Sequence, residues 1–345
     1  MKKIPFYAIT IITLISCGEN ESNTSKDTIV QEKIDQFAEL NTQARNLFGA
    51  LPAFAENPDN PITAEKVELG KMLYFDNRLS KDNTQSCNTC HNLNTFGVDN
   101  KAFSEGNDGK LGGRNSPTTL NAAFHFAQFW DGREPDIEAQ AGGPILNPLE
   151  MAMPSEKAVV QRLSKIKEYT DAFAKVFPDE KSSITYDNIK KAIGAFERKL
   201  VTPSKFDTYI AGDDNALDNE EKEGLQSFIN AGCIACHSGS LLGGTMYQKF
   251  GLFGDYWTLT KSEKVDNGRF DVTKNEADKY MFKVPSLRNI EKTAPYFHDG
   301  SVQDLKESII IMGKTELNKE ITADDANKMI VFLKTLTGNL PNELK

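Results

Sequence analysis

The chain has 345 residues, of which 39% are hydrophobic, and its formal net charge is −9. This length and composition allow a globular protein with a sizeable core and about two domains. Its lysines and arginines form no basic block that could neutralise phosphates, which argues against a nucleic-acid partner.

The first 17 residues have the pattern of an export signal. Lys2 and Lys3 precede an apolar stretch, residues 4–16, that is too short to cross a bilayer. Cys17 ends this stretch, as the acylated cysteine does in bacterial lipoproteins; an ordinary cleavage site beside a chance cysteine is the alternative. We expect residues 1–17 to be a lipoprotein signal peptide with its acylated Cys, and the polar residues 18–35 to be a tether. The protein is then exported to the periplasmic side and lipid-anchored to a bacterial membrane.

The first half of the remaining chain contains one haem-type motif between two predicted helices. A capping residue followed by acidic residues predicts a helix from residue 63 onward. The motif Cys87-x-x-Cys90-His91 follows, then a long Gly- and Pro-rich segment, about 92–155, of the kind that is usually functional. Apolar residues at helical spacing predict a closing helix over 189–200.

The second half repeats this order after a boundary near Pro203, which ends the preceding helix. A capped helix is predicted over 218–228, and the motif Cys233-x-x-Cys236-His237 comes directly after it. A second long loop segment spans about 238–300, and a closing amphipathic helix is predicted over 329–336. No convincing strand pattern appears, so the predicted fold class is mainly α.

Both motifs fit covalent haem attachment. In a Cys-x-x-Cys-His motif two thiolates add to porphyrin vinyl groups, and the adjacent His reaches the iron. A thioredoxin-like redox pair or half a zinc site is the alternative reading. Two copies in an exported chain favour haem, so we expect two cytochrome c-like domains with long loops, 36–201 and 202–345. Each wraps one covalently bound haem c group.

Longer blocks surround these motifs. In the second half they are Tyr-Met-Phe-Lys-Val-Pro-Ser-Leu-Arg-Asn at 280–289 and Thr-Ala-Pro-Tyr-Phe-His-Asp-Gly at 293–300. In the first half they are Arg-Asn-Ser-Pro-Thr at 114–118, Phe-Trp-Asp-Gly-Arg at 129–133, Glu-Ala-Gln-Ala at 138–141 and the stretch 143–151. From about residue 40 onward the chain resembles the bacterial di-haem cytochrome c peroxidases, including their MauG-like relatives.

The resemblance implies a role for several residues. Glu150 and Gln140 would act over the open face of the N-terminal haem, and Trp130 would lie between the haems. Chemically, a carboxylate in an apolar pocket can move the proton that peroxide cleavage requires, and an amide can orient the substrate. Met281 would be the second ligand of the C-terminal haem iron, opposite His237. A core methionine is the alternative, and Tyr280 is a rival ligand.

The resemblance also implies a calcium ion, and two histidines outside the motifs are left to explain. Asn115 matches the amide ligand of the family's calcium ion, with carbonyl donors expected somewhere near residues 258–261. His125 and His298 are expected to be structural. One departure concerns the loop 103–113, where many members carry a His that caps the N-terminal haem; Asn107 stands at that position.

The function that the resemblance implies is reduction of hydrogen peroxide to water. The electrons would come from a small redox protein, a cytochrome c or a cupredoxin, and a homodimer is a further expectation. Two alternatives remain: a MauG-like di-haem oxidase that acts on a partner protein, and a non-catalytic di-haem electron-transfer lipoprotein.

Overall fold

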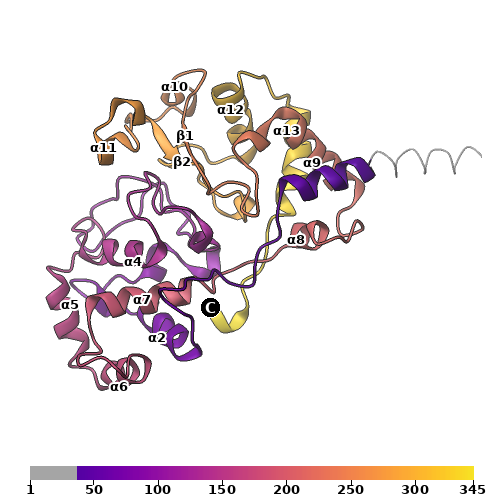
Figure 1. Cartoon of the computed structure of the whole chain (residues 1–345). Coiled ribbons are helices and arrows are strands. Elements are labelled where there is room, and N and C mark those ends of the chain that lie inside the picture. The colour runs from indigo at the N-terminus through magenta and orange to yellow at the C-terminus, as the bar shows by residue number, and fades with distance from the viewer. Residues whose placement is uncertain (1–36) are drawn as a thin grey trace, which may run out of the picture. The chain divides into compact units, whose positions relative to one another are not determined.

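A computed structural model describes residues 37–345 (Figure 1). The predicted signal peptide and tether lie outside the described residues, so both stay predictions. Residues 41–345 form one compact unit, distinct from residues 1–40. Within residues 37–345, no helix combines the length and the apolar character that a membrane span would need.

The described chain is mainly helical, which confirms the predicted fold class. Helical residues 37–47 come first. The α-helices that follow are α2 (Ala64–Tyr74), α3 (Cys87–Cys90), α4 (Ile137–Leu146), α5 (Glu156–Leu163), α6 (Lys167–Val176), α7 (Tyr186–Glu197), α8 (Lys205–Ile210), α9 (Asn219–Ala231), α10 (Tyr256–Thr260), α11 (Phe270–Thr273), α12 (Leu305–Leu317) and α13 (Ala323–Lys334). Two short strands, β1 (Tyr247–Lys249) and β2 (Met281–Lys283), pair antiparallel with Gln248 opposite Phe282.

The helices predicted around each motif are present, with the predicted caps. The side chain of Thr63 accepts a hydrogen bond from the Lys66 amide at the start of α2, and Asp218 caps α9 in the same way. Helix α7 covers most of the predicted helix 189–200, and α13 begins after Thr322, whose side chain accepts from the Asp325 amide. These caps satisfy amides that a helix leaves unpaired at its first turn.

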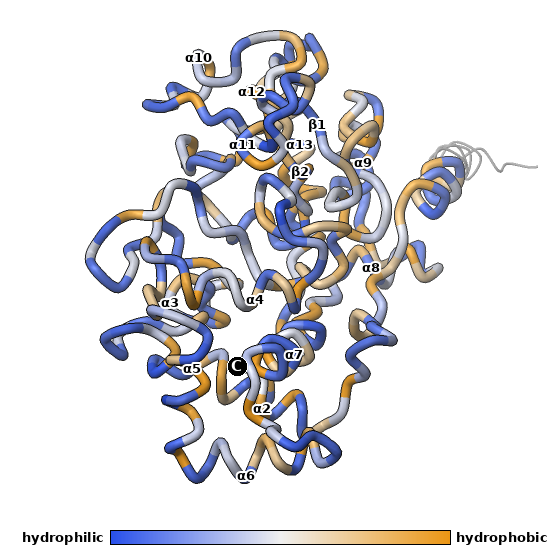
Figure 2. Tube along the Cα trace, turned by 60° about the vertical axis from the view of Figure 1, so that its left-hand side comes forward, coloured by the Kyte–Doolittle hydropathy of each residue, from blue (hydrophilic) through white to orange (hydrophobic). Residues whose placement is uncertain are grey.

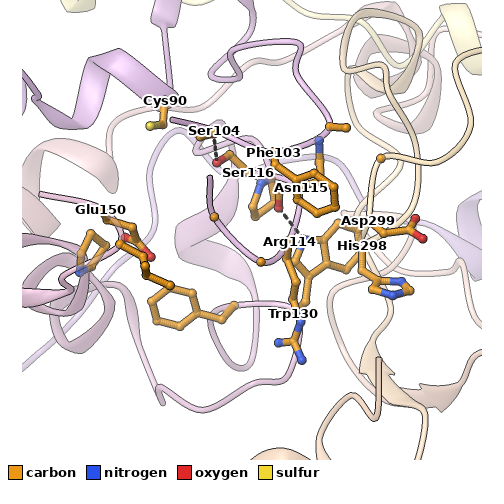
Figure 3. Close-up of a pocket in the computed structure, with 18 of the residues that line it drawn as sticks. Cys90, Phe103, Ser104, Arg114, Asn115, Ser116, Trp130, Glu150, His298 and Asp299 are labelled. Atoms are coloured by element: carbon orange, nitrogen blue, oxygen red, sulfur yellow. Dashed lines mark hydrogen bonds between the residues drawn. The ribbon is translucent and has the colours of Figure 1, made fainter. Parts of the chain in front are cut away.

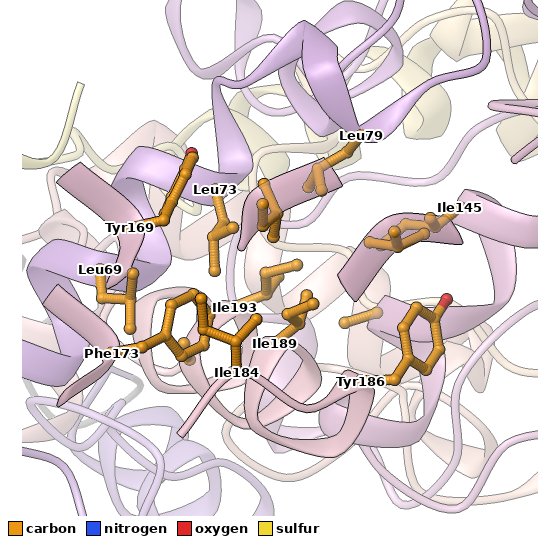
Figure 4. Close-up of a cluster of buried hydrophobic side chains, with 14 of the residues drawn as sticks. Leu69, Leu73, Leu79, Ile145, Tyr169, Phe173, Ile184, Tyr186, Ile189 and Ile193 are labelled. Atoms are coloured by element: carbon orange, nitrogen blue, oxygen red, sulfur yellow. The ribbon is translucent and has the colours of Figure 1, made fainter. Parts of the chain in front are cut away.

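A hydrophobic cluster holds α2, α6 and α7 together in the first half. Figure 4 shows its side chains, among them Leu69 and Leu73 of α2 and Ile189 and Ile193 of α7, all nearly or fully buried. Gly70 lets α2 approach α7 closely, because a Cβ at this position would lie 2.0 Å from the carbonyl oxygen of Ala192. The first haem motif therefore follows a helix, α2, that packs closely on α7.

In the second half α9 packs on α13 in the corresponding way. Phe228 of α9 and Phe332 of α13 have ring centroids 5.3 Å apart, and Leu225 and Met329 are buried beside them. Each buried side chain of this size contributes roughly 1.5–3 kcal/mol. The second haem motif begins two residues after α9, so this packing positions it.

The last residues of the described chain return to the first half. Leu340 and Leu344 belong to a hydrophobic cluster that also contains Tyr74, Phe196 and Cys87. The Nζ of Lys71 also donates to the carbonyl oxygen of Glu343, a distance of 2.6 Å. In Figure 2 apolar segments, coloured orange, meet around α2 and α7 near this end of the chain.

Candidate functional site

The first Cys-x-x-Cys-His motif is a short helix, α3, followed by His91. Cys87 and Cys90 are free thiols, and burial raises the pKa of both. Burial lowers the pKa of His91, and its buried Nδ1 has no hydrogen-bond partner among the described residues. Tyr74 of α2 holds the motif by donating from its hydroxyl to the His91 carbonyl oxygen at 2.6 Å. A neutral imidazole beside two unpaired thiols fits haem c attachment.

These three residues line a cavity of about 1380 Å³. Its volume exceeds the roughly 300–1,000 Å³ of an ordinary small-molecule site, so a porphyrin and a substrate channel fit together. Gln140, Glu150 and Trp130 line the same cavity. Figure 3 shows Cys90, Glu150 and Trp130 around it. The structure therefore brings the predicted catalytic side chains together with the N-terminal haem motif.

Glu150 is a partly buried carboxyl whose proton affinity is altered. Burial raises its pKa, while the Arg133 charge and a hydrogen bond from Asn147 Nδ2 to Glu150 Oε1, at 2.7 Å, act in the opposite direction. Gln140 lies on α4, which starts at the Asp136 cap. A carboxyl with a raised pKa and a neutral amide that line one cavity are suited to moving a proton near a bound substrate.

The loop with Asn107 is tied down next to Glu150. The Asn107 amide donates to the Glu150 carbonyl oxygen at 2.7 Å, and its Nδ2 donates to Asp82 Oδ2 at 2.9 Å. Gly106 allows this contact, because a Cβ there would lie 2.1 Å from the Leu149 carbonyl oxygen. Gly106 lines the cavity, whereas Asn107 is not among the lining residues.

Trp130 lines both this cavity and a second one, described below. Its Nε1 donates to the Asn115 carbonyl oxygen at 2.8 Å, a hydrogen bond drawn in Figure 3. The next residue, Asp131, accepts from Arg114 Nη1 at 2.6 Å, and Arg114 also binds Asp266 in the second half through two nitrogens. This ionic clamp, which motif reading missed, fixes the indole between the cavities.

The second motif lines the smaller cavity, of about 250 Å³. Its thiols, Cys233 and Cys236, are free, and burial raises the pKa of each. The Nδ1 of His237 lies 2.9 Å from the Leu242 carbonyl oxygen. Donation of the Nδ1 proton to this carbonyl would leave Nε2 unprotonated, the usual arrangement of a ligating histidine.

The structure does not bring Met281 to this cavity. Met281 belongs to β2, where its carbonyl oxygen accepts from the Arg269 amide at 2.8 Å, and it is not among the residues that line the cavity of Cys233, Cys236 and His237. Met312 of α12 does line it. The helical spacing of Ile309, Met312 and Glu316 predicts that they share one face of a helix. All three line the cavity.

Three further cavity residues carry buried polar atoms. Glu197, the last residue of α7, is 4% exposed and lines the larger cavity; its Oε2 has no partner among the described residues. Burial raises the pKa of Glu197 to about 8, with the nearby Glu138 adding to the effect. In the smaller cavity the Nζ of Lys283 lies 2.6 Å from the Nδ1 of His125. Sequence reading treated His125 as structural and did not single out Glu197 or Lys283.

Asn115 is buried at 9% exposure and lines both cavities. Its Nδ2 donates to the Lys101 carbonyl oxygen at 2.8 Å, so its side-chain oxygen is the atom available for a cation. No group of three or more His, Cys, Asp or Glu side chains within residues 37–345 is arranged to hold a metal ion. A calcium ion here would therefore depend on amide and carbonyl oxygens, which it accepts.

The chain is similar to known proteins over most of its length. The family model described as "Di-haem cytochrome c peroxidase" matches residues 64–215. A cytochrome c551 peroxidase of Pseudomonas aeruginosa is 47% identical over 306 residues, which are 88% of this chain and 87% of that protein. A cytochrome c551 peroxidase of Nitrosomonas europaea is 48% identical and covers 84% of each chain.

One similar solved structure is a MauG-like protein associated with microbial copper homeostasis. It is 29% identical, with a TM-score of 0.76, and the match covers 86% of this chain and 96% of that one. The fold is therefore shared across most of both chains.

Proposed function

Because the chain belongs to the family of di-haem cytochrome c peroxidases, we propose that it reduces hydrogen peroxide to water at the cavity of Cys87, Cys90 and His91. It is an oxidoreductase that takes electrons from a redox protein. The observation that carries the location is that Glu150 and Gln140 line the same cavity as the first haem motif.

The residues present fit haem c at both motifs: free thiols in pairs, neutral imidazoles and cavities beside them. We propose covalent attachment through Cys87 and Cys90, and through Cys233 and Cys236. When bound, haem supplies the iron that accepts electrons and splits the peroxide O–O bond.

The chain's own residues would do the following. Glu150 would take a proton from one peroxide oxygen and return it to the other, the leaving oxygen, for which its raised pKa is suitable. Gln140 orients the substrate by hydrogen bonding. Trp130, which lines both cavities, bridges the route of the electrons between them. Two electrons and two protons convert one peroxide to two waters.

For the methionine ligand of the second haem we propose Met312, because it lines the cavity of His237 and Met281 does not. Methionine ligation raises the haem potential, as an electron-accepting haem requires.

Several finer assignments extend this proposal. The two haem domains would be 36–201 and 202–345, and a calcium ion would bind the side-chain oxygen of Asn115. The Cys17 anchor would hold the protein to a bacterial membrane on the periplasmic side, where a small cytochrome c or cupredoxin donates electrons. A homodimer is also proposed.

Two rival functions make different predictions. A MauG-like oxidase would act on a partner protein, but the MauG-like structure above is less similar to this chain in sequence than the two peroxidases are. A pure electron-transfer lipoprotein would have no use for a raised-pKa carboxyl in the larger cavity.

The deciding experiment measures peroxide consumption by the holo-protein with a reduced small cytochrome c, with and without prior reduction. Stoichiometric donor oxidation, two electrons per peroxide, supports the proposal. No turnover, with six-coordinate spectra at both haems, would favour the electron-transfer rival. Oxidation of a partner protein at the expense of peroxide, without donor turnover, would favour the oxidase.

A further inference from the structure

In the smaller cavity a buried lysine of the second half contacts a histidine of the first half. Lys283 of β2 is 6% exposed, and its Nζ lies 2.6 Å from Nδ1 of His125, a residue of the first half. The Lys283 amide also donates to the Trp130 carbonyl oxygen at 2.8 Å. Lys283 and His125 both line the cavity of Cys233, Cys236 and His237.

This pair has a hydrogen-bond acceptor in His125 Nδ1 but no counter-charge. Among residues 37–345 no carboxylate forms an ion pair with Lys283, and burial is the cause of its lowered pKa. When the Lys283 ammonium donates to His125 Nδ1, the ring proton must sit on Nε2, and that buried nitrogen has no partner among the described residues. A buried ammonium without a counter-charge is strongly unfavourable, so the site calls for an anion.

We propose that Lys283, supported by His125, binds a propionate carboxylate of the C-terminal haem. The inference rests on the proposed function in one respect, namely that Cys233, Cys236 and His237 hold a haem. Haem c brings two carboxylates into whatever cavity it fills, and those carboxylates require partners as much as the ammonium does.

Among the lysines and arginines of the described chain, the cavity lining favours Lys283 for this role. Lys249 is the other lysine on the lining, no arginine of the described chain lines it, and Lys249 is exposed to solvent. A solvated lysine contributes little to binding a charge, whereas a buried one interacts strongly with it. Because His125 and the Trp130 carbonyl hold Lys283 in place, the propionate contact also connects the second haem to the first half.

The test measures the reduction potential of the C-terminal haem in the holo-protein between about pH 6 and pH 8. Lys283→Met should lower this potential, because an uncompensated carboxylate stabilises ferric iron. In this variant the potential should also fall with rising pH, because the buried propionate then binds a proton when the iron is reduced and releases it when the iron is oxidised. Lys283→Arg keeps the charge and should stay near the wild-type potential. Lys249→Met is the matched control and should change neither the value nor its pH dependence.

An unchanged potential and pH profile in Lys283→Met would overturn the proposal and make Lys283 a structural amine. If that variant fails to incorporate haem, resonance Raman of the wild-type protein gives the answer through the propionate bending mode. A mode typical of a solvated, unbonded propionate would equally refute the contact. Haem content, read from absorbance and mass, separates this outcome from a failure of the proposed function, in which no second haem is bound at all.

Discussion

Arg198 binds the Glu138 carboxylate with two nitrogens, Nε at 2.8 Å and Nη2 at 2.5 Å, and makes no ion pair with its sequence neighbour Glu197. Glu138 also accepts from Asn60. Two buried glutamates in one neighbourhood thus have opposite proton affinities: the pKa of Glu138 is lowered with its partners' help, and that of Glu197 is raised to about 8.

Glu197→Gln should stabilise the protein at neutral and alkaline pH. The folded state holds the Glu197 proton more tightly than the unfolded state, so wild-type stability falls as pH rises from about 4.5 toward 8. At about 1.4 kcal/mol per pH unit the gain for the variant reaches up to about 3 kcal/mol at pH 7. Denaturant unfolding of the holo-protein near pH 5 and pH 8 measures it. An equal difference at both pH values would contradict the explanation.

Glu138→Gln is the matched comparison and should act in the opposite direction. It leaves the Arg198 guanidinium buried without its counter-charge, a loss of about 3–5 kcal/mol for pairs of this kind. The same unfolding measurements should therefore show one glutamate variant gaining stability and the other losing it. If both lose stability alike, Glu197 has a partner in the holo-protein.

Glu150→Gln should retain both haems and slow peroxide cleavage by on the order of a hundredfold or more. Burial raises the pKa of Glu150, and the carboxyl must be unprotonated to act as a base, so wild-type activity should fall as pH decreases through that pKa. The acidic limb of the rate profile should vanish in the variant. Glu263→Gln, an exposed carboxyl on the same cavity, is the control. Near-normal turnover in Glu150→Gln would remove Glu150 from the mechanism.

Met312→Ala should abolish the iron–sulfur charge-transfer band of the C-terminal haem and lower its potential, because the thioether ligand is lost. Met281→Ala should change neither, since Met281 is absent from the lining of that cavity. Absorption spectra and potentiometric titration of the two variants decide between the methionines. The reverse pattern would restore Met281 as the ligand.

The fully oxidised protein should contain a high-spin N-terminal haem and begin turnover without a lag. Asn107 binds the Asp82 side chain and the Glu150 backbone and does not line the cavity, so its amide leaves the iron uncapped. Electron paramagnetic resonance of the oxidised protein tests this. Lys110→Met should leave the spectrum unchanged, which excludes the loop lysine as a ligand. Two low-spin signals, with activity only after reduction, would show that another residue caps the haem.

Local signals predicted the helices well, and the resemblance indicated which residues to look for near the first motif. Thr63 and Asp218 cap the helices that precede the motifs, as expected from neighbouring residues alone. Gln140 and Glu150 line one cavity with the first Cys-x-x-Cys-His motif, and their roles there stay predictions. The contacts that were missed join distant residues: Lys283 and His125 are 158 positions apart, and no local pattern marks such a pair. Met312 lies on a helix that sequence reading did not single out, beyond the block that drew attention to Met281.

The return of Leu340 and Leu344 to the cluster of Tyr74 and Cys87 has a consequence for biogenesis. The hydrophobic cluster beside Cys87 is completed only after Leu340 and Leu344 have been synthesised. A haem could be attached at Cys87 before that, but the packing of Leu340 and Leu344 around Tyr74 and Cys87 forms only afterwards. Deletion of Leu340 and Leu344 should therefore change the absorption spectrum of the first haem. The two halves should also unfold in one calorimetric transition.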